Sequence, residues 1–248
     1  MKPRLNQALL LLIVCLCCGR TTLADELTYA VTLVNESPPD CPLKASGQIV
    51  FHEQLFQNAV KTRWDFDIAI TNVSSKGILA YEGEINFTPE LGLPVREIDQ
   101  PDFFFKRQIM TPGNQRVLKL DPGPTGTVGY DPSMQQPKVA KATFTVSFVE
   151  FADGSTYGSS KWGSALPKAR RVTVARLQEL DQAFKNGGET ALKNALDAAL
   201  ARKDNPSPTA DQLEHLKLIF DQDGSAALTA KMEESLTAAK EHGPTTEN

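Results

Sequence analysis

The segment Thr62-Arg63-Trp64-Asp65-Phe66-Asp67-Ile68-Ala69-Ile70-Thr71-Asn72 gives the clearest indication of the fold class of this 248-residue chain. From Trp64 to Ile70 every second residue is large and apolar, and the residues between them are charged or small. Successive side chains of a β-strand point to opposite faces, so this alternation predicts a strand with one buried face. Its four bulky side chains indicate a strand in the middle of a sheet.

The same period of two recurs on both sides of this stretch, in short runs separated by turn-forming residues. Asn72 to Gly77 has the residues of a hairpin, Thr111-Pro112-Gly113-Asn114 has the type II turn pattern, and Asp153-Gly154 is a second hairpin signal. Many short strands joined by such turns predict an antiparallel β-sandwich over residues 25–160. Further strands are predicted at 27–33, 48–56, 78–87, 102–109, 116–120 and 142–149.

One strand has an irregular apolar pattern near its end. The run 142–149 alternates cleanly, but at Val149-Glu150-Phe151 the apolar phase shifts by one residue. A shift of one residue exchanges the two faces of a strand. The pattern therefore predicts either a β-bulge near Val149 or a strand end that is buried on both faces.

Beyond Trp162 the apolar period changes to 3.6 residues, and alanine and leucine replace valine, threonine and phenylalanine. This pattern predicts helices at 168–186, 189–203, 209–221 and 225–241, with Thr209 as an N-cap. The predicted fold class is therefore mainly β, an antiparallel sandwich followed by a helical C-terminal region at 161–243 and a disordered tail at 244–248. We expect the β-rich part, ending near Ser160, to fold without the helices.

The N-terminus has the pattern of a secretory signal peptide. Lys2 and Arg4 precede the apolar run 8–18, which is shorter than the roughly 20 residues that a bilayer span needs. Small residues at Thr22 and Ala24 favour cleavage before Asp25. We therefore expect residues 1–24 to be removed and the mature chain to be exported, periplasmic or extracellular, without a membrane span. A lipid anchor is the weaker alternative, because no small residue directly precedes Cys17 or Cys18.

The charge balance argues against nucleic acid as a partner. Residues 25–160 contain 11 Lys and Arg against 17 Asp and Glu, and residues 161–248 contain 12 against 13. A nucleic-acid binder needs a positive surface to displace counterions from phosphates. The one local cluster of cations is interpreted as a solvated helix face or linker; it consists of Lys168, Arg170, Arg171 and Arg176.

Candidate catalytic residues are few and far apart in the sequence. His52, His215 and His242 are the only histidines, and none lies within helical or hairpin reach of another. After cleavage of the leader Cys41 is the remaining cysteine, interpreted as structural, with a nucleophile or a disulfide between chains as alternatives. Gly158 to Gly163 matches no serine-nucleophile spacing. We predict no catalytic residue.

A fragment of a calcium-loop motif occurs in the helical region. Asp221-Gln222-Asp223-Gly224-Ser225 begins like an EF-hand loop, but its glycine is fourth rather than sixth and Met232 stands where the bidentate glutamate belongs. A turn between helices explains the segment more simply. We predict no metal and no cofactor.

Three consecutive aromatic residues form the one candidate interaction patch. Phe103, Phe104 and Phe105 would place rings on both faces of the predicted strand 102–109. At least one ring must then be covered by something other than a single-sided core. The cover is expected to come from the same chain, with a partner protein as the alternative.

Three motifs resemble those of immunoglobulin-like domains in uncharacterised exported bacterial proteins. They are the Asn72-Val73-Ser74 strand end, the Pro112-Gly113 turn and the hairpin Phe151-Ala152-Asp153-Gly154-Ser155. The resemblance covers roughly residues 27–160 and implies an immunoglobulin-like fold and an exported location. It transfers no active-site residue to this chain.

These observations favour a non-enzymatic binding or structural module that contacts a protein or an envelope component. The contact would use sandwich edges, loops or the helical tail. The alternative is a hydrolase or carbohydrate-active module whose residues converge only in three dimensions, with a site near the Pro- and Gly-rich loop 121–137.

Overall fold

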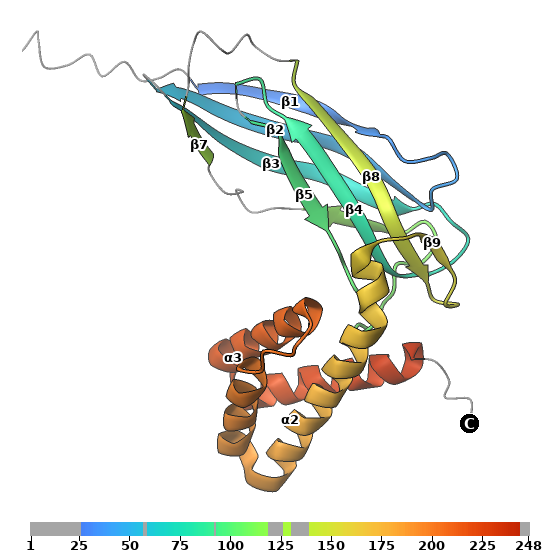
Figure 1. Ribbon diagram of the computed structural model, residues 1–248, viewed down its shortest axis with the longest axis vertical. Helices are drawn as coiled ribbons and strands as arrows, with labels where there is room; N and C mark the ends of the chain where they lie inside the picture. The colour runs from blue at the N-terminus through green and yellow to red at the C-terminus, as the bar shows by residue number, and fades with distance from the viewer. Residues whose placement is uncertain (1–25, 57–58, 92, 119–125, 130–138, 244–248) are drawn as a thin grey trace, which may run out of the picture.

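The computed structural model describes residues 26–56, 59–91, 93–118, 126–129 and 139–243. The predicted signal peptide and the tail 244–248 lie outside these ranges, as does most of the loop 121–137. The β-rich part occupies one end of the molecule, and the helices lie beyond one end of its sheet (Figure 1). The strands are β1 (Glu26–Asn35), β2 (Leu43–Phe56), β3 (Ala59–Asn72), β4 (Ile78–Thr88), β5 (Val95–Asp99), β6 (Gln115–Leu118), β7 (Gly126–Gly129), β8 (Lys141–Phe151) and β9 (Thr156–Gly158).

The nine strands form one sheet, with main order β5-β4-β8-β1-β2-β3-β6; β7 pairs with β3 and β9 pairs with β8. Strand β1 joins the two halves of this sheet. Its first part runs antiparallel to β2, from the pair Glu26 and Gln54 onward, while Leu33 to Asn35 run parallel to β8. The sheet curls so that its halves pack together. The fold is mixed, with a β-rich part followed by helices, so the prediction of a mainly β chain with a helical C-terminal region holds only roughly. The ladder is continuous through β1 rather than divided between two sheets.

The core lies inside the curl and confirms the alternation that indicated the fold class. Trp64 and Phe66 of β3 are buried, and Ile68 and Ile70 are completely inaccessible to solvent. The Phe87 ring of β4 packs edge-on against Trp64 and Phe66, with ring centroids 5.2 and 5.8 Å apart. The two halves of the sheet are therefore held together mainly by the burial of apolar side chains.

The predicted hairpin at 72–77 is wrong, although the turn chemistry is correct. β3 pairs with β2, β6 and β7, whereas β4 pairs with β5 and β8, so the chain crosses between the halves of the sheet here. Asn72 forms the turn by accepting a hydrogen bond from the Ser74 amide at 3.0 Å and donating to the carbonyls of Lys76 and Met110 at 2.8 Å. Local hydrogen bonds specify such a turn without specifying which strands pair.

The predicted strand at 102–109 is also wrong. Asp102 and Met110 make isolated bridges to Ala80 and Ile78, and the chain between them turns, with the Lys106 amide donating to the Phe103 carbonyl at 2.8 Å. The segment is as apolar as a strand because its three phenylalanine rings enter two different cores, Phe103 one and Phe104 and Phe105 the other. Strand β5, which pairs with β4 from Gly83 to Phe87, was missed in the sequence.

The phase shift in β8 corresponds to a real bulge. Ser147 has no partner between the pairs Glu82 with Phe148 and Gly83 with Val146. As a result Val149 enters the core inside the curl, while Phe148 packs on the opposite face against Leu166 and Trp162. Both alternatives predicted from the pattern therefore hold, because the bulge lies near Val149 and this strand end is buried on both faces. Gly163 makes the contact possible, since a Cβ there would lie 2.7 Å from Phe148 ring atoms.

The helical part consists of α2 (Lys161–Leu200) and α3 (Ser207–His242), each broken at one glycine. Gly188 and Gly224 have φ angles of 63° and 84°, so four helical segments result, near the predicted positions. The predicted N-cap Thr209 is wrong: α3 begins after Pro206, and Thr209 is buried, donating to the Ala169 carbonyl at 3.1 Å. Neither helix combines the length and apolar character that crossing a bilayer requires.

Candidate functional site

The three phenylalanines are buried by the protein itself. Phe103 enters the core inside the curled sheet, whereas Phe104 and Phe105 enter the helical core together with Leu79 and Leu177. Their exposed fractions are only 8, 7 and 9%. The cover therefore comes from the same chain, as expected, and the alternative of a patch open to a partner protein does not fit this burial. The segment joins the β-rich and helical parts.

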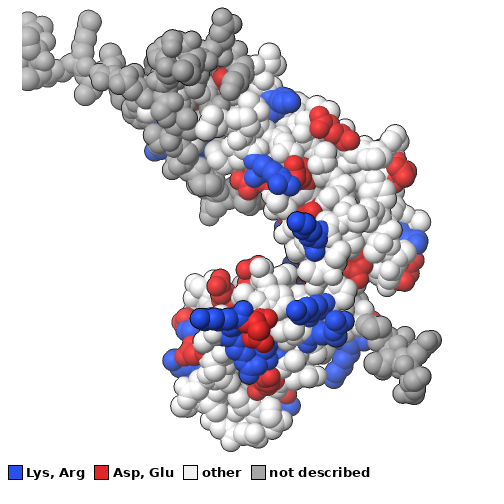
Figure 2. Space-filling view, in the orientation of Figure 1, with Lys and Arg blue, Asp and Glu red and all other residues white. Residues whose placement is uncertain are grey.

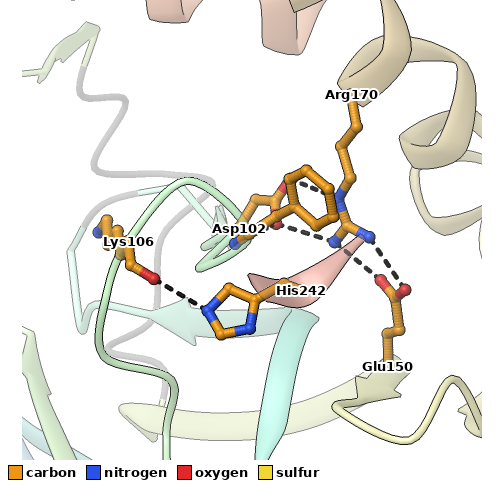
Figure 3. A network of polar contacts seen from close by, with 6 residues as sticks. Asp102, Lys106, Glu150, Arg170 and His242 are labelled. Carbon is orange, nitrogen blue, oxygen red and sulfur yellow. Dashed lines mark hydrogen bonds and ion pairs between the residues drawn. The ribbon is translucent and has the colours of Figure 1, made fainter. Parts of the chain in front are cut away.

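A buried ion-pair cluster lies beside these rings (Figure 3). Arg170 of α2 donates two hydrogen bonds to Asp102, from Nε at 3.0 Å and Nη2 at 2.8 Å, and its Nη1 donates to Glu150 of β8 at 2.9 Å. The guanidinium also lies 4.6 Å from the centroid of the Phe104 ring. Burial opposes its charge, but hydrogen bonds to the two carboxylates raise the pKa of Arg170 above its ordinary value.

This geometry corrects the prediction of a solvated cationic face. Arg170 and Arg176 are 7% and 8% exposed, and only Lys168 and Arg171 face solvent. Arg176 donates to Glu179 at 3.0 Å and to the Asn205 side chain at 3.4 Å, which ties α2 to the loop before α3. Sequence periodicity did not reveal the burial of Arg170, because its acidic partners Asp102 and Glu150 are distant in the chain.

A cleft of about 720 Å³ opens beside the Arg170 cluster, between the end of the sheet and α2. We call it the junction cleft. Its walls combine apolar side chains with charged and amide groups, and His242 at the end of α3 closes one side, its Nε2 lying 3.1 Å from the Lys106 carbonyl (Figure 3). The lining of the junction cleft includes Leu79, Phe104, Phe151, Pro167, Arg171 and Val174.

A second groove, of about 190 Å³, lies where the two end strands of the curled sheet face each other. We call it the edge groove. β5 contributes Glu97, Ile98 and Asp99, β6 contributes Arg116, Val117 and Leu118, and Phe66 and Ile85 line it from the core. Ile98 and Val117 are 48% and 53% exposed. Sequence reasoning missed this site because β5 has no recognisable alternation and its approach to β6 is a tertiary feature.

A polar network ties the two sides of the edge groove together. Tyr81 of β4 donates to Asp99 at 2.6 Å, and Arg116 donates to the Tyr81 hydroxyl at 3.0 Å and also pairs with Asp99. Burial, reinforced by the charge of Asp99, raises the pKa of Tyr81 well above its ordinary value. The neutral phenol is therefore the form that the folded protein stabilises.

We expect alkaline pH to destabilise the protein through Tyr81. The unfolded chain ionises near pH ~10 while the folded protein keeps its proton, so this stabilisation is complete below pH ~10 and declines as the pH rises further. Urea unfolding should show that Tyr81→Phe costs about 1–2 kcal/mol at neutral pH and makes the alkaline decline less steep. An identical decline in both proteins would rule out Tyr81 as its source. Burial also raises the pKa of Tyr29, but both proteins contain this residue, so it cannot cause a difference between them.

His52 has acidic neighbours that the sequence did not reveal. Its Nε2 lies 3.1 Å from Asp65 Oδ2, while Nδ1 lies 3.2 Å from Glu26 and 3.3 Å from the Thr28 hydroxyl. A Thr, His and Asp in this order resemble a nucleophile, base and acid. Thr28, however, is exposed and shares Nδ1 with Glu26. We therefore interpret the cluster as an ion-pair network linking β1, β2 and β3.

Cys41 lines a third, open cavity of about 640 Å³, together with Asp40, Lys76 and Tyr157. A cysteine beside a carboxylate is part of what a hydrolase needs, but the lining of this cavity includes no histidine to act as the base. Cys41 is also only 3% exposed. The geometry favours a structural thiol over a nucleophile.

The segment 221–225 has the geometry of a helix break. Asp221 accepts a hydrogen bond from Lys217 at 2.7 Å, and Gly224 supplies the break in α3. Throughout the ranges that the structure describes, no group of three His, Cys, Asp or Glu residues is arranged to hold a metal ion. Comparison of the chain with protein-family models, curated proteins and solved structures finds no match in any of the three.

Proposed function

We propose that the protein is an exported, non-enzymatic binding module that accepts an extended segment of a partner protein at the edge groove. The supporting observation is that β5 and β6, the two ends of the main strand order, face each other across one groove. An edge strand has unpaired backbone N–H and C=O groups, which pair readily with an added strand. This groove offers two such edges.

The side chains of the edge groove support an occupant with alternating residues. Ile98 and Val117 are half exposed at its rim, while Phe66 and Ile85 supply apolar surface from the core. An added strand would direct every second side chain toward that surface. The partner is therefore an extended segment with apolar residues at alternate positions.

The fold and location belong to the same proposal. The three motifs that resemble those of exported immunoglobulin-like domains lie in the β-rich part. The pairing of β1 with both β2 and β8 would suit a sandwich whose first strand pairs with both sheets. The leader-like N-terminus supports export. The hydrolase alternative placed its site near the loop 121–137, and the described part of that loop, β7, pairs with β3 as an ordinary strand.

Site-specific photo-crosslinking in the native cell envelope tests the proposal. A benzophenone side chain at position 98 or 117 should give one discrete adduct with a single partner protein. The same probe at Leu218, which is 50% exposed on α3, serves as the control for general exposure. Mass spectrometry of the adduct should locate the crosslink in a segment with alternating apolar residues.

A second variant checks that the adduct reflects strand addition. Val117→Pro removes a backbone donor from the edge of β6 and should abolish the adduct formed at position 98. Adducts of equal intensity at 98, 117 and 218 would contradict the proposal. So would cell fractionation that finds the full chain in the cytoplasm with its leader uncleaved.

A further inference from the structure

The junction cleft has the size and position of a small-molecule site. Its volume of about 720 Å³ falls within the roughly 300–1,000 Å³ typical of ligand pockets. Such pockets occur preferentially where two structural units meet. Here the walls come from the sheet end, from the segment that contains Phe104, and from both helices.

One wall of the junction cleft is apolar. Leu79 and Phe104 come from the β-rich part, and Pro167 and Val174 from α2, with Phe151 of β8 nearby. The Phe104 ring is held in place, because Arg170 stacks on it and Phe105 packs edge-on at 5.1 Å between centroids. This wall provides a rigid surface for a flat apolar body.

Among the described residues that line the junction cleft, one cation is available to a ligand. Glu150 pairs with Arg170, whose charge it shares with Asp102, and Asp153 pairs with Lys76 at 2.8 Å. Arg171 of α2 is exposed, and no hydrogen bond or ion pair joins its side chain to another described residue. Positions 171, 174 and 178 lie on one face of the helix, so Arg171 stands beside Val174 and the Gln178 amide.

From this combination we infer that the junction cleft binds a small soluble aromatic anion. The ring packs against Phe104 and Val174, and a carboxylate or sulfonate accepts hydrogen bonds from the Arg171 guanidinium. The Arg170 guanidinium already pairs with two carboxylates, Asp102 and Glu150, so its role is to keep the wall in position while Arg171 holds the anion. This site is separate from the edge groove, so it does not depend on the proposed function.

Fluorescence titration of the folded protein with 1-anilinonaphthalene-8-sulfonate tests the inference. Arg171→Glu should weaken binding about tenfold or more, since a charge-assisted hydrogen bond contributes ~1.5–3 kcal/mol and 1.4 kcal/mol is a factor of ten. Lys203→Glu makes a similar charge change at an exposed position outside the cleft and should leave the affinity within about twofold. The neutral analogue N-phenyl-1-naphthylamine should bind more weakly than the anion.

Two further measurements distinguish binding in the junction cleft from binding elsewhere on the protein or to lipid. Ala175→Trp places bulk at the cleft wall and should also reduce binding, whereas Ile98→Lys in the edge groove should not. Equal effects of Arg171→Glu and Lys203→Glu, or equal affinity for the neutral and anionic probes, would overturn the inference. The protein could also sediment with anionic phospholipid vesicles and lose this binding in Arg171→Glu. That result would show that Arg171 binds a lipid headgroup, and it would overturn the inference as well.

Discussion

Replacing Arg170 with methionine is expected to lower the free energy of unfolding by about 3–5 kcal/mol. The substitution keeps much of the side-chain volume but removes the charge that two largely buried carboxylates share. Asp102 and Glu150 would then remain unpaired in a region of low dielectric, where desolvation opposes their negative charges. Urea unfolding followed by circular dichroism measures the loss.

The neighbouring arginine provides a matched control. Arg171→Met removes the same charge from the next residue of α2, but this side chain is exposed, so stability should change by no more than about 0.5 kcal/mol. Neutralising the partners as well, in Arg170→Met with Asp102→Asn and Glu150→Gln, should recover part of the lost stability. Equal stabilities for the Arg170 and Arg171 variants would show that the ion-pair cluster does not hold the junction together.

Ending the chain after Ser160 is expected to give an aggregating β-rich fragment without a cooperative melt. This reverses the expectation from the sequence, because the structure shows that the helices cover Leu79, Phe104 and Phe105 on one side and Phe148 on another. Removing them would expose a large apolar surface and leave Asp102 and Glu150 without Arg170. Size-exclusion chromatography and a thermal melt of the fragment test this outcome.

A modified fragment identifies the cause. Replacing Leu79, Phe104 and Phe105 with serine in the same fragment leaves Phe103 in the core and removes the apolar surface that packs in the helical core, while Phe148 is unchanged. We expect this version to be mostly monomeric, with β-type circular dichroism. A monomeric, cooperatively melting fragment with the original residues would show instead that the β-rich part is stable by itself.

The junction cleft is formed by residues from both the β-rich and the helical part. Asp102 lies in the segment between β5 and β6 and pairs with Arg170 of α2 (Figure 3). His242 at the end of α3 contacts the Lys106 carbonyl of the same segment. A space-filling view shows the two parts meeting below the sheet, with acidic and basic side chains intermixed over the helices (Figure 2). The helical part therefore shapes the junction cleft as well as protecting the rings of the β-rich part.

The features that depend on near neighbours can be derived from the residues alone. The alternation from Trp64 to Ile70 specified a buried strand face, and the glycines at 188 and 224 specified breaks between helices. The Thr111 to Asn114 turn also appears as predicted, with Gly113 at a φ of 78° and the Asn114 amide bonded to the Thr111 carbonyl. Period, turn chemistry and backbone freedom act over a few residues, so they can be read directly from the chain.

Which of these elements meet depends on packing between distant parts of the chain. The polar turn at Asn72 crosses between the halves of the sheet, although the same local bonds would suit a hairpin. Arg170 pairs with Asp102, which lies 68 positions away, and Tyr81, Asp99 and Arg116 meet at the edge groove. Such contacts arise from burial of apolar surface over the whole chain, which places distant charges together and leaves no local pattern in the sequence.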